Sequence, residues 1–418
     1  MKKLLLELAL VASLPTHSQT MPYLAPSNDA TGPNLLCCTP VNAIDPHVHS
    51  VTVFGGLGDG NFPNLVGASF AGINGGPDDT YVTGSASYAM ISGGYDNIDN
   101  ALAGAIISQH ARLYTAATHG LIIGGGNHWI SSGDSNSIVG GAQHHISSVN
   151  DDNIIAGGAR NTITGPGGAS AIIAGSQQTI SGGAYSAIVA GYANTISAPA
   201  IAQTIVGGAN NTINGAATYA AIVGGHNNAV SINYGSILGG YDNTVSGYAG
   251  AVVAGDTSQV TAPYAVAFGS GRVASWPGGI FYGARNQSTP GDRNNLIVAQ
   301  SGQTSGAMAQ GLSSYGVGDY PAVPYNTAGI ARVMIVGRQQ HSNNVVAYTG
   351  IVVFHSGNGG IIVADSQNWT KEVDHIGVAA LPALRSGASD QFALLVTGRA
   401  STTIDWNADV QVATVSGP

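Results

Sequence analysis

Acidic side chains are the groups in the middle of this sequence that could support acid–base chemistry. No glutamate occurs between residues 90 and 283, and the candidate carboxylates are Asp134, Asp151, Asp152, Asp242 and Asp256. Hydrolysis of a glycosidic bond needs two carboxyl groups roughly 5–9.5 Å apart. Asp151 and Asp152 are adjacent on an expected loop, where neighbouring side chains tend to point apart. We therefore expect no catalytic residue and no enzymatic activity.

Histidines and cysteines near the N-terminus could bind a metal. His47 and His49 are two residues apart, so on a strand both would point to the same side. Around a three-fold axis, six imidazoles would form an octahedral set suited to iron or nickel, whereas two solvated histidines would bind nothing. Cys37 and Cys38 are adjacent and are the only cysteines, which excludes a disulfide framework and favours free thiols. We expect no metal site and no cofactor.

Polar and aromatic side chains near the C-terminus could contact a sugar. The expected loops of residues 329–418 contain His355, Asn358, Asn368, Trp369 and His375. Loops are where binding residues concentrate. Aromatic rings and amides suit a glycan, but each of these five residues could instead be packed or solvated without any ligand.

A short repeat over residues 90–283 must position the five aspartates. Two aliphatics, a small residue and glycine recur in steps of 14 to 18 residues. The stronger copies start at Ile122, Ile138, Ile172, Ile188, Ile205, Ile222, Ile237 and Val252. The weaker copies start at Met90, Ile106, Ile154, Val266 and Ile280. A second aliphatic follows each start, often after Asn-Thr, as in Asn211-Thr212-Ile213. This period predicts a solenoid with two short strands per coil and glycine in its turns.

The paired aliphatics of each copy predict an apolar outer stripe. Neighbouring strand residues point to opposite faces, so one aliphatic of Ile188-Val189 fills the coil and the other leaves it. The outward set is Ile123, Val139, Ile173, Val189, Val206, Val223, Leu238 and Val253. A continuous apolar stripe needs a partner surface, and identical chains would associate around a symmetry axis. The pattern permits a dimer or a trimer.

Tyrosines precede several copies of the repeat. They are Tyr88, Tyr185, Tyr219, Tyr234, Tyr248 and Tyr264. Stacked coils would align them in a row that could serve as a platform for sugar rings or as a ladder of packed rings. We expect the packed ladder.

Charge and hydropathy limit the partners of this chain. Charged residues make up only 8% and the net charge is −9, so nucleic acid is not expected as a partner. Residues 1–20 combine Lys2 and Lys3 with an apolar run, which indicates either a secretory signal or a short amphipathic helix. The run is too short to span a membrane. We expect the helix.

The residue pattern of the sequence changes at three points along the chain. We expect an N-terminal attachment segment at 1–60, a repeat shaft at 61–287, a neck or linker at 288–328, and a C-terminal domain at 329–418. In the last domain, residues 402–414 alternate strictly, with Ile404, Trp406 and Val410 on one face. Such alternation is typical of a half-buried antiparallel strand, and several such strands predict a small β-sandwich.

Two features resemble known families. The repeat resembles the left-handed parallel β-roll of trimeric bacterial adhesin heads and phage fibre shafts, and its Asn-Thr-Ile motifs are similar to repeats of phage tail proteins. The run Leu395-Val-Thr-Gly-Arg399, followed by residues 402–410, looks like the ending of phage virion proteins that carry such repeats.

The resemblance implies an all-β chain: a left-handed parallel β-roll or β-helix solenoid, trimeric, followed by a small antiparallel β-sandwich. It implies a structural phage tail fibre, assembled in the host cytoplasm, that docks on other virion proteins through its N-terminus. Residues 329–418 would bind a host-surface glycan such as lipopolysaccharide. The alternatives are a polysaccharide depolymerase tailspike, a bacterial adhesin, or a capsid decoration fibre.

Overall fold

The computed structural model describes residues 23–25, 34–37, 43–44, 52–54, 65–66, 71–74, 80–82, 88–197, 199–282, 293–313, 323, 326–357, 361–385 and 391–416. All regular structure in these ranges is β-strand, and no helix that could span a membrane occurs in them. Residues 1–20, with their expected helix, lie outside the described residues, as do His47 and His49. The chain forms two units, Met1–Ala174 and Gly175–Pro418.

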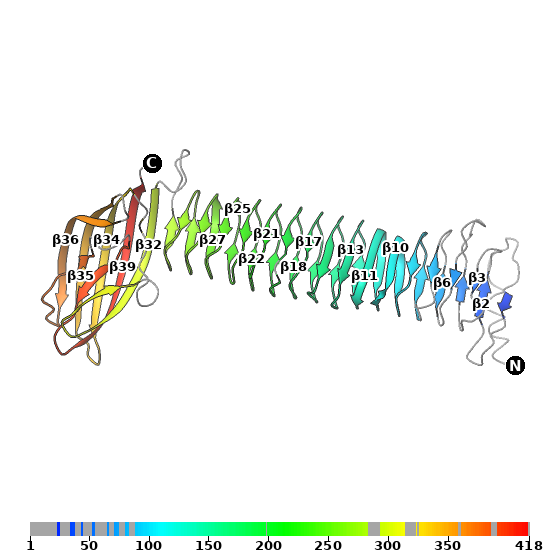
Figure 1. Ribbon diagram of the computed structural model, residues 1–418, viewed down its shortest axis with the longest axis horizontal. Coiled ribbons are helices and arrows are strands. Elements are labelled where there is room, and N and C mark those ends of the chain that lie inside the picture. Colours follow the sequence, from blue (N-terminus) through cyan, green and yellow to red (C-terminus); the bar gives the residue numbers. More distant parts are fainter. Residues whose placement is uncertain are drawn as a thin grey trace. The chain divides into compact units, whose positions relative to one another are not determined.

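The N-terminal unit is built from two ladders of parallel strands (Figure 1). The first ladder contains β2 (Asn34–Cys37), β4 (Thr52–Phe54), β6 (Gly72–Asn74), β8 (Met90–Ser92), β12 (Ser137–Val139), β14 (Ile154–Ile155) and β16 (Ala171–Ile172). The second contains β3 (Ala43–Ile44), β5 (Leu65–Val66), β7 (Tyr81–Val82), β9 (Ile98–Asp99), β13 (His145–Ser148) and β15 (Thr162–Gly165). Two longer strands, β10 (Ala105–Thr118) and β11 (Leu121–Asp134), run through both ladders. β1 (Tyr23–Ala25) pairs antiparallel with β2. The parallel ladders thus reach into residues 1–60, the range expected to be an attachment segment.

The C-terminal unit has two ladders of the same kind. Its first ladder contains β18 (Ala187–Ile188), β20 (Thr204–Ile205), β22 (Ala221–Ile222), β24 (Ser236–Ile237), β27 (Ala251–Asp256), β29 (Val266–Phe268) and β31 (Ile280–Tyr282). Its second contains β17 (Thr179–Ile180), β19 (Thr195–Ile196), β21 (Thr212–Ile213), β23 (Ala229–Val230), β26 (Thr244–Val245), β28 (Gln259–Val260) and β30 (Val273–Ala274). The short β25 (Gly240–Tyr241) pairs with β27. The predicted β-solenoid is therefore confirmed in both units.

The strand register corrects the repeat at its weaker copies. Ile138 pairs with Ile155, and Ile155 pairs with Ile172, so the inward residue of that copy is Ile155 rather than Ile154. The copies assigned to Met90, Val266 and Ile280 shift by one residue in the same way, to Ile91, Ala267 and Phe281. All of these inward side chains are buried. Because both neighbours in a weak copy are apolar, the sequence pattern leaves this choice open.

A column of buried amides holds the turns of the C-terminal unit. The backbone N–H of Asn211 donates to Oδ1 of Asn194 at 2.9 Å, and that of Asn228 donates to Oδ1 of Asn211 at 3.0 Å. The Asn211 side-chain amide donates to the carbonyls of Gly207 and Gly225, both at 3.0 Å. Each asparagine thus satisfies backbone groups that the turns would otherwise leave unpaired.

Two histidines replace asparagine in this column of the N-terminal unit. The rings of His128 and His144 stack 5.1 Å apart, and both side chains are buried. The backbone N–H of Asn161 donates to Nδ1 of His144 at 3.2 Å. Burial, together with the nearby His128, lowers the pKa of His144 to about 4. His144 is therefore held neutral inside the coil.

Five long antiparallel strands form the C-terminal sheet, in the order β32 (Arg293–Ser305), β39 (Thr403–Ser416), β34 (Thr327–Gln339), β35 (Val345–Ser356) and β36 (Ile362–Asp374) (Figure 1). A second sheet has the order β33 (Ala309–Leu312), β38 (Leu394–Thr397) and β37 (Ala383–Leu384). The rings of Phe354 and Phe392 meet between the sheets at 5.2 Å. The predicted inward face of β39 is confirmed, because Ile404, Trp406 and Val410 are buried.

The C-terminal sheet begins earlier than the sequence indicates. β32 and β33 lie within residues 288–328, the range expected to be a neck or linker. β32 also pairs antiparallel with β31, the last solenoid strand, so the sheet continues directly from the final coil. Proline and glycine in this range favoured a linker, but residues 293–305 pair along their whole length with β39.

Candidate functional site

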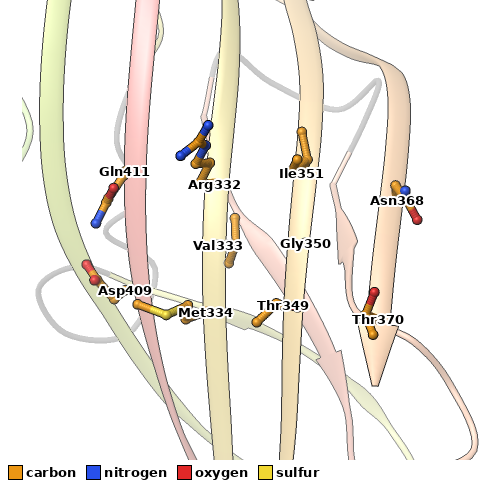
Figure 2. Close-up of a pocket in the computed structure, with 10 residues that line it drawn as sticks. All are labelled: Arg332, Val333, Met334, Thr349, Gly350, Ile351, Asn368, Thr370, Asp409 and Gln411. Atoms are coloured by element: carbon orange, nitrogen blue, oxygen red, sulfur yellow. The ribbon is translucent and has the colours of Figure 1, made fainter. Parts of the chain in front are cut away.

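A hollow of about 370 Å³ lies on the outer face of the C-terminal sheet. Figure 2 shows its lining, which is Arg332, Val333, Met334, Thr349, Gly350, Ile351, Asn368, Thr370, Asp409 and Gln411. These residues come from β34, β35, β36 and β39. Ligand sites of small molecules commonly measure about 300–1,000 Å³, so the hollow lies within that range.

Two rows of paired residues across the strands build this hollow. One row runs from Gln411 through Arg332 and Ile351 to Asn368. The next row runs from Asp409 through Met334 and Thr349 to Thr370. Residues two apart on a strand share a face, which brings both rows to the outer surface.

The lining combines apolar and polar groups. Met334 and Ile351 are exposed and apolar, while Arg332, Asp409 and the two amides can donate or accept hydrogen bonds. An apolar floor with a few convergent polar groups is typical of a site for a small polar ligand. A sugar unit, with hydroxyl groups around an apolar ring face, fits this description.

The predicted sugar-contact residues do not lie together in the structure. Asn368 lines the hollow. His355 lies on β35, four residues from Ile351 and thus roughly 13 Å away along the strand, and its Nδ1 pairs with Asp365 at 2.8 Å. Both residues lie on strands, although we expected loops, because β35 extends to Ser356 and β36 extends to Asp374, past the runs that the sequence indicated.

Trp369 and His375 do not line the hollow. Trp369 pairs with Gly350, and a Cβ on Gly350 would collide with the Trp369 ring. Trp369 therefore packs against the sheet instead of offering its ring to a sugar beside Asn368. His375 follows the end of β36, where its N–H donates to the carbonyl of Val345 at 2.9 Å. Asn358 lies outside the described residues.

The expected apolar stripe lies on the outside of the coils in each unit. In the N-terminal unit it contains Ile123, Val139 and Ile173; in the C-terminal unit it contains Val189, Val206, Val223, Leu238 and Val253. Val253 is half-buried, and the other seven side chains are 37–51% exposed. Packing of this stripe against other copies of the chain stays a prediction.

The tyrosines of the C-terminal unit form a ladder. Tyr219 and Tyr234 stack with centroids 5.5 Å apart, and Tyr234, Tyr248 and Tyr264 follow with edge-to-face contacts of 5.5 and 5.6 Å. Each tyrosine ring therefore contacts its neighbour along the ladder, while 40–53% of each residue stays exposed. The contacts support a ladder of packed rings rather than an open platform for sugars.

A second group of chemically active side chains lies in the N-terminal unit. Nδ1 of His110 and Oδ2 of Asp96 are 2.8 Å apart, and the same oxygen is 4.0 Å from Nη2 of Arg112. The ring of Tyr95 contacts His110 edge-on, with centroids 4.5 Å apart. The three charged or titratable side chains are 33–41% exposed, so solvent reaches them.

The outward row of the second ladder continues this group. Arg112 pairs with Trp129, and Trp129 pairs with His145, one coil further. The corresponding positions of the C-terminal unit hold mostly threonine: Thr179, Thr195, Thr212, Ala229 and Thr244. Arg112, Trp129 and His145 thus occupy positions where the C-terminal coils mostly have threonine.

Sequence reasoning missed Asp96 and His110, since only aspartates from Asp134 onward were weighed. The available signal was the loss of Asn-Thr-Ile in the coils before residue 146. Of the aspartates that were weighed, Asp134 is hydrogen-bonded to His119 at 2.6 Å, and this bond lowers the pKa of Asp134. Its backbone N–H also donates to Oδ1 of Asp151. Within the described residues, no three His, Cys, Asp or Glu side chains are grouped so as to hold a metal ion.

Comparison with solved structures finds phage tailspike proteins. The chain is similar to the Acinetobacter phage vB_ApiP_P1 tailspike protein, with 9% identity, a TM-score of 0.24, and coverage of 87% of this chain and 80% of the other. It is similar to the Acinetobacter baumannii phage AM24 tailspike protein, with 8% identity, a TM-score of 0.23, and coverage of 88% and 78%. A third is tailspike protein gp49 of A. baumannii bacteriophage Fri1, a capsular polysaccharide depolymerase, with 8% identity, a TM-score of 0.18, and coverage of 87% and 79%. No family model and no curated protein matches the sequence.

The expectation that the chain has no enzymatic activity is contradicted by these neighbours, one of which, the Fri1 tailspike, is a capsular polysaccharide depolymerase. The expectation was wrong because it rested mainly on the lack of a clear carboxylate pair, and hydrolysis by such a pair is one of several ways to break a polysaccharide.

Proposed function

We propose that this chain is a subunit of a phage tailspike that attaches to a polysaccharide of the host surface and acts on it. The observation that carries the proposal is the hollow on the C-terminal sheet, where an apolar floor is edged by Arg332, Asp409 and the amides of Asn368 and Gln411. The resemblance of the repeat and of the C-terminal run to phage virion proteins supports the assignment to a phage tail. Docking on other virion proteins through the N-terminal segment belongs to the same proposal.

Three chains would associate through the apolar stripe. Side chains such as Val206 and Val223 lie on neighbouring coils and expose 43% and 49% of their surface, which a partner would cover. Three copies of each hollow would also multiply a weak single contact through effective concentration, by roughly 10²-fold or more. Val206→Asp should yield single chains of 41.9 kDa in mass photometry, whereas Thr212→Asp, on the other outward row, should leave the assembly intact.

Calorimetric titration of the full-length protein with purified host polysaccharide tests attachment through the hollow. Arg332→Ala should weaken binding about tenfold or more, since a hydrogen bond from a charged group contributes roughly 1.5–3 kcal/mol. Arg338→Ala is the matched control, because Arg338 is exposed on the same strand but does not line the hollow. Equal affinities for the two variants would refute the assignment of the hollow, and binding to capsids in place of host polysaccharide would favour a decoration protein.

A further inference from the structure

Charged side chains are scarce in this protein, with only 12 lysines and arginines in 418 residues. Asp96, His110 and Arg112 nevertheless lie together on two successive coils of the N-terminal unit. They are brought together because His110 sits one coil beyond Asp96, where its backbone N–H donates to the carbonyl of Tyr95 at 2.9 Å. A carboxylate, an imidazole and a guanidinium that lie together on an exposed face could take part in catalysis.

The contact with Asp96 favours one tautomer of the imidazole. With Nδ1–H donating to Asp96 Oδ2 at 2.8 Å, a neutral His110 ring carries its lone pair on Nε2. An imidazole held by a carboxylate in this way can accept a proton at the other nitrogen. The resulting imidazolium is stabilised by the carboxylate that orients it.

Arg112 supplies the complementary charge. Its Nη2 stands 4.0 Å from Asp96, a loose contact that leaves most of its donors available. A guanidinium pairs with carboxylates through two parallel hydrogen bonds. The cluster therefore offers one base and one carboxylate-binding group, side by side.

From this arrangement we infer that the cluster cleaves an acidic polysaccharide by β-elimination at a uronate unit. Arg112 pairs with the uronate carboxylate and makes the proton on the adjacent C5 more acidic. Nε2 of His110 takes that proton, the C5–H electron pair forms the C4=C5 double bond, and the C4–O bond breaks. The imidazolium returns the proton to the leaving oxygen, so neither water nor a further reactant is consumed.

Elimination fits this cluster better than hydrolysis does. Hydrolysis by the common route needs two carboxyl groups, one on each side of the bond. The cluster holds one accessible carboxylate, Asp96, and that group is already bonded to His110. Asp99, three residues on, is fully buried and cannot reach a substrate.

The row that starts at Arg112 provides a surface for the sugars next to the reacting unit. Trp129 and His145 follow on the next two coils, so the row spans roughly 10 Å at about 4.8 Å per coil. Trp129 is 36% exposed and contacts His145 edge-on. A partly exposed aromatic ring can pack against the apolar side of a sugar, and this would hold the polysaccharide along the coils.

The inference rests on the proposed function for the class of substrate, and its test separates the two. The full-length protein is incubated with alginate, polygalacturonate, hyaluronan and the host polysaccharide, and the ultraviolet absorbance of an unsaturated uronate is followed. Mass spectrometry then measures the fragments, because an elimination product is lighter than the hydrolysis product by one water. Elimination predicts unsaturated fragments from at least one of these uronate polysaccharides.

Variants assign the reaction to the cluster. His110→Ala should lower the rate about 10²- to 10⁴-fold, the usual contribution of a general base. His119→Ala is the matched control, since His119 is also exposed and bonded to an aspartate through Nδ1. Arg112→Lys should lower the rate while keeping the positive charge, and melting curves verify that each variant folds.

The outcomes are distinct. Fragments that contain the added water, absence of fragments from every uronate polysaccharide, or an unchanged rate in His110→Ala would each overturn the inference. Binding lost in Arg332→Ala, with unsaturated product still formed by the wild-type protein, is the result expected if both proposals hold. Normal attachment without unsaturated product would leave the proposed attachment standing and remove only the elimination.

Discussion

Asp99 should make the N-terminal unit less stable as pH rises. Its side chain is fully buried in a column where Val82 precedes it and Leu113 follows it, both apolar. Oδ1 accepts the N–H of Ala101 at 3.0 Å, whereas Oδ2 has no hydrogen-bond partner. Burial raises the pKa of Asp99 from 3.8 to about 7, because the charged form loses its hydration.

The sign and size follow from the two pKa values of Asp99. Below about pH 4 the carboxyl is protonated in both the folded and the unfolded chain, and folding carries no penalty. Between about pH 4 and 7 only the unfolded chain ionises, so the free energy of unfolding falls steadily. Above about pH 7 the full loss is reached, about 4 kcal/mol at 1.36 kcal/mol per pKa unit.

Asp99→Asn isolates this effect because it keeps the acceptor for Ala101 and removes the ionisation. Urea unfolding followed by circular dichroism at pH 4, 5.5, 7 and 8.5 should show the variant gaining on the wild type as pH rises. Asp134→Asn, which alters an exposed aspartate, is the control and should not reproduce the trend. A difference between Asp99→Asn and wild type that stays constant from pH 4 to 8.5 would refute the reasoning.

Two further predictions concern the buried column in the turns. In the folded chain the pKa of His144 is lowered to about 4. Below about pH 6.5 the unfolded chain therefore binds a proton that the folded chain does not bind. The free energy of unfolding should fall by about 3 kcal/mol as pH drops to 4. His144→Asn, which restores the usual residue of the column, should remove this loss in melts at pH 4.5 and 7; equal pH dependence in both proteins would contradict it. Asn211→Ala should lower stability by roughly 3 kcal/mol, since it leaves the N–H of Asn228 and two glycine carbonyls unpaired. Thr212→Ala, at the next residue and on the outward side of β21, is the control, and a matching effect from both changes would count against the amide column.

Short-range pattern was enough to determine the architecture of the coils. A strand alternates its faces every residue, so Ile188-Val189 had to place one side chain inside and one outside, and Ile188 is buried. The same alternation identified the inward face of β39. Where a copy was weak, as at Ile154-Ile155, both residues were apolar and the pattern could not choose between them.

The site residues depended on contacts across coils and strands. Asp96 and His110 are fourteen residues apart in sequence but lie on adjacent coils, and only the register of the stack brings their side chains within 2.8 Å. The hollow joins Arg332 to Asn368 and Gln411, which come from three separate strands. Local sequence periodicity determined which face each residue occupies. The pairing order of strands distant in sequence, which depends on the summed energy of the whole sheet, decided which residues became neighbours.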